Sequence, residues 1–196
     1  DILIRTEESP SSLLGGSLDD IGGTVLSGDG PFFLAEACEY KGNIRYYYPQ
    51  IAIVLNIDED HLDYYKDMDD IVNAFEGYME NIQPNGVAII NADDPHSKTL
   101  PAHVTGRAIT YGINNTEADY YVTDVTFDSV GHPAFTLHFP DGTSEHYQLG
   151  IIGRFNIYNA VASIIACDVT HVDRKIIKQG IEEYRPLHRR MEYVGD

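Results

Sequence analysis

The segment QIAIVLNIDEDHLDYY, residues 50–65, places several carboxylates and one imidazole directly after an apolar run. Carboxylate oxygens and an imidazole nitrogen are ligands that proteins offer to divalent cations. Mg²⁺ in particular takes few protein ligands and completes its coordination with water and substrate phosphates. The acidic group around His61 therefore predicts a cation site that works together with phosphate. An acidic strand-to-helix loop, in which Asp or Asn caps the next helix, explains the same residues without a ligand.

A second carboxylate lies near the end of another apolar run, PFFLAEAC, residues 31–38, which contains Glu36 and is followed by Glu39. Parallel strands of an open α/β sheet end at one edge, and ligands bind in the crevice beyond that edge. We therefore predict that Glu36 and His61 face each other across one crevice and share a cation, directly or through one water. The alternatives are an exposed surface glutamate and a histidine that is hydrogen-bonded to a neighbouring aspartate.

Two asparagines, Asn156 and Asn159, stand at the start of a predicted helix in GRFNIYNA. A side-chain amide can pair with the edge of a base because it both donates and accepts, although asparagine is also a preferred N-cap. Arg189 and Arg190 can bind phosphate through their planar guanidinium groups, or form a solvated basic pair. The sequence contains no G-x-x-x-x-G-K-[ST], and so alone it offers no evident cradle for a triphosphate.

These side chains need a scaffold that brings the ends of several strands together. Short β-branched and apolar runs predict four strands of a mostly parallel sheet, at residues 31–37, 51–57, 87–90 and 108–111. Apolar periodicity and turn residues predict helices at residues 69–82, 156–167 and 173–184. The alternation of strands and helices indicates βαβ units, and hence an α/β fold with helices flanking the sheet.

Between residues 119 and 149 the apolar period changes to two, and Asp141-Gly142 is typical of a hairpin turn. We predict three antiparallel strands here, which form a smaller sheet separate from the parallel one.

Composition limits the classes of partner. The chain has 196 residues with 31 acidic and 13 basic side chains, a net charge of −18, which argues against nucleic-acid binding through phosphate neutralisation. Cys38 and Cys167 both have apolar surroundings in the sequence, a pattern that suits a reducing compartment. No apolar run approaches the roughly 18 residues that span a bilayer, and so no membrane partner is predicted. The start at Asp1, without an initiator Met, indicates a piece of a larger protein.

In order and spacing, five segments resemble the central domain of the Mur ligases. These segments are FLAEACEY, IAIVLNIDEDHLDYY, INADDP, GRFNIYNAVASIIA and LHRRMEYVG. The resemblance implies a P-loop-type α/β domain within an enzyme of cytoplasmic peptidoglycan synthesis that uses ATP and Mg²⁺. Within the family, the likeness is greatest to members that join L-alanine to UDP-N-acetylmuramate through an acyl phosphate. The alternatives are another Mur-type ligase, such as one that acts on murein tripeptide, and a non-catalytic binding module that retains the fold.

The resemblance also assigns roles to individual residues. Glu36 matches the family's magnesium-binding glutamate, and His61, in the D-H-L-D motif, matches its magnesium-associated histidine. Asn156 and Asn159 match asparagines on the adenine side of the nucleotide. Arg190 matches an arginine that reaches the phosphates, so that His61 and Arg190 are the expected catalytic residues.

Three departures accompany the resemblance. Residues 1–196 lack the G-T-H-G-K-T phosphate loop and the UDP-binding domain that precedes it. They also lack the amino-acid-binding domain. Phe155 stands where many members have histidine. The chain is therefore expected to be the central domain alone and to be inactive by itself.

Overall fold

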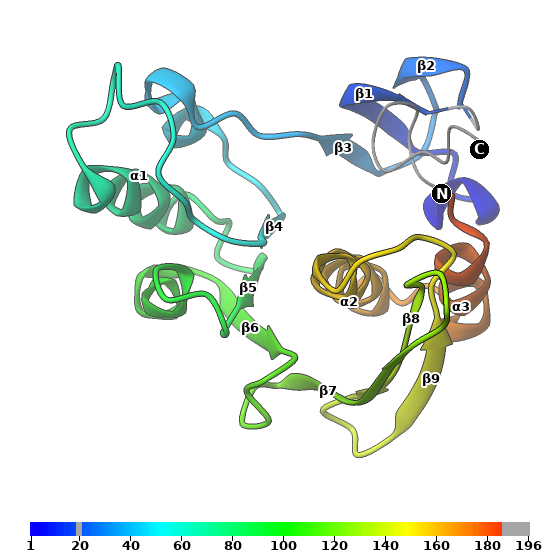
Figure 1. Cartoon of the computed structure of the whole chain (residues 1–196). Coiled ribbons are helices and arrows are strands. Elements are labelled where there is room, and N and C mark those ends of the chain that lie inside the picture. Colours follow the sequence, from blue (N-terminus) through cyan, green and yellow to red (C-terminus); the bar gives the residue numbers. More distant parts are fainter. Residues whose placement is uncertain (19–20, 186–196) are drawn as a thin grey trace, which may run out of the picture.

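The larger of two sheets contains six strands in the order β4-β5-β6-β7-β8-β9 (Figure 1). The computed structural model of the chain describes residues 1–18 and 21–185. The six strands are β4 (Ile51–Val54), β5 (Val87–Asn91), β6 (Arg107–Gly112), β7 (Tyr120–Phe127), β8 (Pro133–His138) and β9 (Ser144–Gln148). From β4 to β7 each neighbouring pair is parallel. This arrangement confirms the predicted α/β fold with a mostly parallel sheet.

The strands of the period-two region continue this sheet, and the prediction of a separate antiparallel sheet is wrong. β7 joins β6 through two parallel pairs, Tyr111 with Tyr120 and Gly112 with Tyr121, before β8 and β9 add antiparallel pairs. Strict alternation reports that one face of a strand is solvated. Alternation does not indicate which strand is the hydrogen-bonded neighbour. The short parallel pairing of β6 with β7 is enough to join the antiparallel strands to the parallel sheet.

A smaller sheet of order β2-β1-β3 contains β1 (Ser11–Leu18), β2 (Gly23–Leu26) and β3 (Phe33–Ala35). β1 runs antiparallel to β2 and parallel to β3. The prediction that residues 31–37 belong to the same sheet as residues 51–57 is therefore wrong. Phe33 and Leu34 remain 68% and 42% exposed, so this apolar run is not buried on both faces. The pairing of β3 with β1, which lies in a glycine-rich segment, was not foreseen.

Three α-helices and three 3₁₀-helices complete the described chain. The α-helices are α1 (Met68–Glu80), α2 (Phe155–Asp168) and α3 (Arg174–Glu183), and the 3₁₀-helices are η1 (Leu3–Arg5), η3 (Tyr40–Tyr46) and η4 (Ser97–His103). The Asp67 carboxylate accepts the N–H of Asp70 at the start of α1, and that of Asp173 accepts the N–H of Lys175 at the start of α3. Such side-chain caps satisfy donors that have no partner within the helix. All three predicted helices are confirmed to within two residues at each end.

The sheet separates two apolar clusters because successive residues of a strand point to opposite faces. On β5, Ile89 packs with α2 and α3 in the larger cluster, whereas Ile90 packs with α1 in the other. Figure 1 shows α1 and α2 on either side of β4 and β5. Among the described residues, no helix has the length and apolar character needed to cross a membrane.

Candidate functional site

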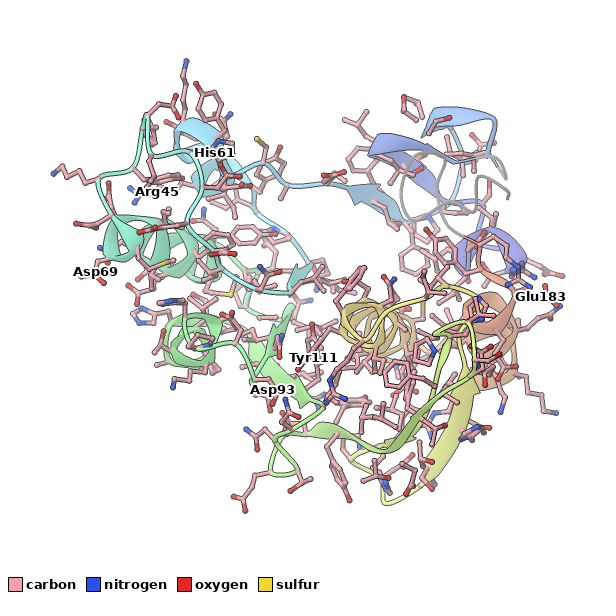
Figure 2. The ribbon with its side chains drawn as sticks, viewed as in Figure 1. Arg45, His61, Asp69, Asp93, Tyr111 and Glu183 are labelled. Atoms are coloured by element: carbon pink, nitrogen blue, oxygen red, sulfur yellow. The ribbon has the colours of Figure 1, made fainter. Side chains whose placement is uncertain are left out.

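His61 is presented by a tight turn that follows β4. Its backbone has a positive φ of 56°, a conformation that non-glycine residues adopt rarely. The Asp60 carboxylate accepts the N–H of His61 at 2.6 Å, and the His61 carbonyl accepts the N–H groups of Tyr64 and Tyr65 at 2.8 and 3.0 Å. These bonds fix the turn, and the imidazole lies beside η3 (Figure 2).

Two carboxylates accompany the imidazole. Glu39 Oε1 lies 3.2 Å from His61 Nε2, and Asp60 Oδ1 lies 3.7 Å from Nδ1. The ring of Tyr40 packs against the imidazole with 4.8 Å between centroids. Buried Tyr65 donates its hydroxyl to the Glu39 carbonyl at 2.5 Å, which ties η3 to the turn.

The ligand atoms of Glu39, Asp60 and His61 all lie within 4.8 Å of one another. Two carboxylate oxygens and one imidazole nitrogen form a donor set that fits Mg²⁺. The expected alternative, a histidine bonded to neighbouring acidic side chains, describes the same geometry without a cation. The arrangement is therefore chemically suited to Mg²⁺, which takes few protein ligands and completes its coordination with water and substrate phosphates.

Glu36 lies just past β3, where its Oε2 accepts the N–H of Gly15 at 2.8 Å. It lines a hollow of about 410 Å³ together with Gly15, Cys38 and Glu39. The segment that connects β3 with η3 therefore presents Glu36 to this hollow and carries, three residues later, the carboxylate that contacts His61.

The predicted geometry of Glu36 and His61 is wrong in one respect. They do not follow adjacent strands of one sheet, since β3 and β4 belong to different sheets. The structure instead brings His61 together with Glu39, a residue for which no role was predicted. The positive φ values of Lys41 and Gly42, 55° and 70°, turn the chain after Glu39, and nothing in the sequence alone predicts this contact.

Asn156 and Asn159 occupy the first turn of α2 and contact each other. Asn156 is buried, and its Nδ2 donates to the Ile152 carbonyl at 2.8 Å. Asn159 Nδ2 donates to Asn156 Oδ1 at 3.0 Å. The N-cap of α2 is Arg154, which in the described structure forms no side-chain cap. The simple N-cap explanation of these asparagines is therefore wrong.

Phe155 precedes this pair and exposes its ring. A Cβ on Gly153, whose φ is 100°, would lie 2.8 Å from the Phe155 ring. The ring thus occupies the space that a glycine leaves open. The remaining predicted site residue, Arg190, lies with Arg189 outside the described residues 1–18 and 21–185.

A mostly parallel sheet with helices on both faces, and acidic and amide side chains beyond its strands, defines the class of open-sheet α/β ligand-binding domains. The comparison with known families is more specific. The chain belongs to the Mur ligase family, because the profile of the Mur ligase middle domain matches residues 28–167.

Known relatives agree with this assignment. The UDP-N-acetylmuramate–L-alanine ligase of Caldanaerobacter subterraneus subsp. tengcongensis is 36% identical over 194 residues, which cover 99% of this chain and 42% of the relative. The chain therefore spans about two fifths of the length of that protein.

Two solved structures share the fold. The UDP-N-acetylmuramate-alanine ligase MurC of Thermotoga maritima has a TM-score of 0.81 and 22% identity, over 99% of this chain and 43% of that one. The MurF ligase of the same organism, in complex with ADP, has a TM-score of 0.73 and 17% identity, over 95% of this chain and 44% of its own.

Proposed function

We propose that this chain is the ATP-binding middle domain of a ligase that joins L-alanine to UDP-N-acetylmuramate. The observation that carries the proposal is the 36% identity over nearly the whole chain to a protein of that name. In the full-length protein, ATP would activate the substrate carboxylate as an acyl phosphate, which the amine of L-alanine then attacks. The product serves peptidoglycan synthesis.

Within this proposal, Glu36 and His61 hold Mg²⁺, and Glu39 and Asp60 lie close enough to His61 to orient it. The support is that Glu36 and Glu39 line the same hollow and that Glu39 contacts His61. When bound, the cation would neutralise charge on the transferring phosphate, a large part of catalysis in phosphoryl transfer. The protein's own contribution is to hold the imidazole through Glu39 and through the turn of residues 60–65.

The base of the nucleotide would bind at the first turn of α2, where the amides of Asn156 and Asn159 meet. A neighbour of the same fold binds ADP. Arg190 is proposed to reach the phosphates and, with His61, to act in catalysis. That assignment rests on the sequence resemblance alone.

Residues outside 1–196 would supply the phosphate loop and the domains that bind UDP and the amino acid. Two observations support this division. The sequence contains no G-x-x-x-x-G-K-[ST]. β3 and β4 are terminal strands of their sheets, and Phe33, Leu34 and Ile53 near those edges are between 42% and 68% exposed. Unpaired strand edges with apolar side chains favour the addition of another strand.

The reaction is tested by phosphate release from ATP in the full-length protein with UDP-N-acetylmuramate and Mg²⁺. We expect release that depends on L-alanine. Release with murein tripeptide and not with L-alanine would assign the protein to another Mur-type ligase. No release with either, despite nucleotide binding, would indicate a binding module.

The metal assignment is tested by Mg²⁺ titration of the same reaction. Glu36→Gln removes a proposed ligand, and we expect it to raise the Mg²⁺ concentration for half-maximal rate by about tenfold or more. Glu59→Gln is the matched control, because Glu59 is exposed, lies on the acidic segment that contains His61, and has no role in the proposed site. Equal responses of the two variants would show that only general negative charge matters.

A further inference from the structure

The NADDP segment, residues 91–95, begins at the last residue of β5 and makes none of the proposed ligand contacts. Its Asp93 carboxylate nevertheless accepts four hydrogen bonds. The donors are the backbone N–H groups of Ile113, Asn114 and Asn115, at 2.7, 2.9 and 2.9 Å, and the hydroxyl of Tyr158, at 2.9 Å. A carboxylate offers about four acceptor positions. Asp93 is thus an anchor, held by four hydrogen bonds, between the loop after β6 and helix α2.

Tyr158 lies in the first turn of α2, between Asn156 and Asn159 in sequence. Its ring packs against that of buried Tyr111, with 6.4 Å between centroids and 60° between planes. Burial, reinforced by the hydrogen bond to Asp93, raises the pKa of Tyr158 to about 12. The hydroxyl therefore remains a proton donor at neutral pH.

The same loop contacts α2 a second time. Arg154 Nη2 donates to Asn114 Oδ1 at 3.2 Å, and Asn114 Nδ2 lies 3.5 Å from the Tyr158 hydroxyl. Since Arg154 forms no side-chain cap in the described structure, these tertiary contacts hold the start of the helix. Figure 2 shows Asp93 and Tyr111 near β6 and α2, away from His61 beside η3.

We propose that Asp93 and Tyr158 are positioning residues for the base-reading amides of Asn156 and Asn159, an inference that rests on the proposed function. The Tyr158–Asp93 bond fixes the first turn of α2 in its rotation about the helix axis and in its position along that axis. Base edges are read by hydrogen bonds that weaken steeply away from about 2.7–3.2 Å. Releasing this turn therefore weakens binding of the purine, and leaves the separate cation site near His61 in place.

The experiment compares Tyr158→Phe with Tyr120→Phe in the full-length protein. Tyr120 donates its hydroxyl to Asp168 Oδ2 at 2.8 Å, so each variant removes one phenol–carboxylate bond, at opposite ends of the same helix. The measurements are the dissociation constant of Mg·ADP, the ATP-to-GTP preference, the Mg²⁺ requirement and Tm.

We expect Tyr158→Phe to weaken Mg·ADP binding about fivefold and to narrow the preference for ATP over GTP, with an unchanged Mg²⁺ requirement. Tyr120→Phe should lower Tm by about as much as Tyr158→Phe does, because each variant loses one phenol–carboxylate bond, and it should leave the affinity for Mg·ADP unchanged. Equal nucleotide affinities in the two variants would overturn the positioning role.

Asn159→Ala separates this inference from the proposed function. If Asn159→Ala weakens Mg·ADP binding and Tyr158→Phe does not, the base site stands and the positioning role is wrong. If Asn159→Ala leaves affinity unchanged, the base site is wrong and the positioning role falls with it.

Discussion

Asn91 joins the end of β5 to the segment that leads to His61, and removing its side chain should lower the free energy of unfolding. The side chain is 5% exposed. Its Nδ2 donates to the Leu55 carbonyl at 2.8 Å, and its Oδ1 accepts the N–H of Asp93 at 2.9 Å. Asn91→Ala removes both bonds and leaves the two backbone groups without these partners.

Each such bond contributes about 1 kcal/mol net, and the loss is larger where a buried partner stays unpaired. We therefore expect Asn91→Ala to lower the free energy of unfolding by about 2–3 kcal/mol. With a urea m-value of about 2 kcal/mol/M, the unfolding midpoint would fall by roughly 1 M. Amide hydrogen exchange of residues 56–61 should accelerate at the same time, because the exit of β4 loses its tie to β5.

Asn91→Asp is the informative control. The new carboxylate can still accept the backbone N–H of Asp93, but it places an oxygen against the Leu55 carbonyl. Burial and this repulsion raise the folded-state pKa of the introduced carboxyl above its unfolded value. The variant should therefore be least stable above that folded-state pKa and should recover as pH falls through it. An Asn91→Asp protein as stable as the original at pH 7, or a loss below about 0.5 kcal/mol for Asn91→Ala, would refute the reasoning.

Three further outcomes are expected. Gly112→Ala should cost about 1–2 kcal/mol in urea unfolding, because the added Cβ would lie 2.9 Å from Asp93 Oδ1, whereas Gly77→Ala, with no neighbour within 4 Å, should stabilise α1 by up to about 1 kcal/mol. The Asp128 carboxylate accepts backbone and side-chain hydrogen bonds from His132, which lower its pKa from 3.8 to about 2. The contribution of these bonds to folding stability should be complete above pH 3.8 and should be lost as pH falls through about 2. An NMR titration of the Asp128 carboxyl checks the pKa. Residues 1–196 alone should release no phosphate from ATP with L-alanine, and detectable release would contradict the proposed source of the phosphate loop.

The parallel strands and helices were predictable because their signals are local. Runs such as residues 51–54 and 87–90 have apolar side chains on both faces, and Asp67 and Asp173 mark helix starts. The pairing of the strands was not predictable from local signals, because it depends on contacts between residues that are distant in sequence. The run at residues 31–37 resembles that at residues 51–57, yet β3 pairs with β1 and leaves its side chains exposed.

The chemical character of the site was also predictable, but its partners were not. The sequence identifies His61 as the one imidazole in the acidic segment of residues 50–65. It does not reveal that Lys41 and Gly42, with positive φ, turn the chain after β3. Nor does it reveal that Tyr65 then binds the Glu39 carbonyl. These irregular contacts bring Glu39, rather than Glu36, next to the imidazole, and no periodicity encodes them.

The end of β5 is the common support of both proposed ligand areas. Asn91 ties it to the exit of β4 and so to His61, and Asp93 ties it to α2 and so to the two asparagines. The two anchors are themselves bonded, since Asn91 accepts the N–H of Asp93. An enzyme that transfers phosphate must hold the base and the phosphates of one nucleotide at a fixed separation. Asn91 and Asp93 provide such a link, because the Asn91 side chain binds both the Leu55 carbonyl and the backbone N–H of Asp93, while the Asp93 carboxylate binds Ile113 N–H and the Tyr158 hydroxyl.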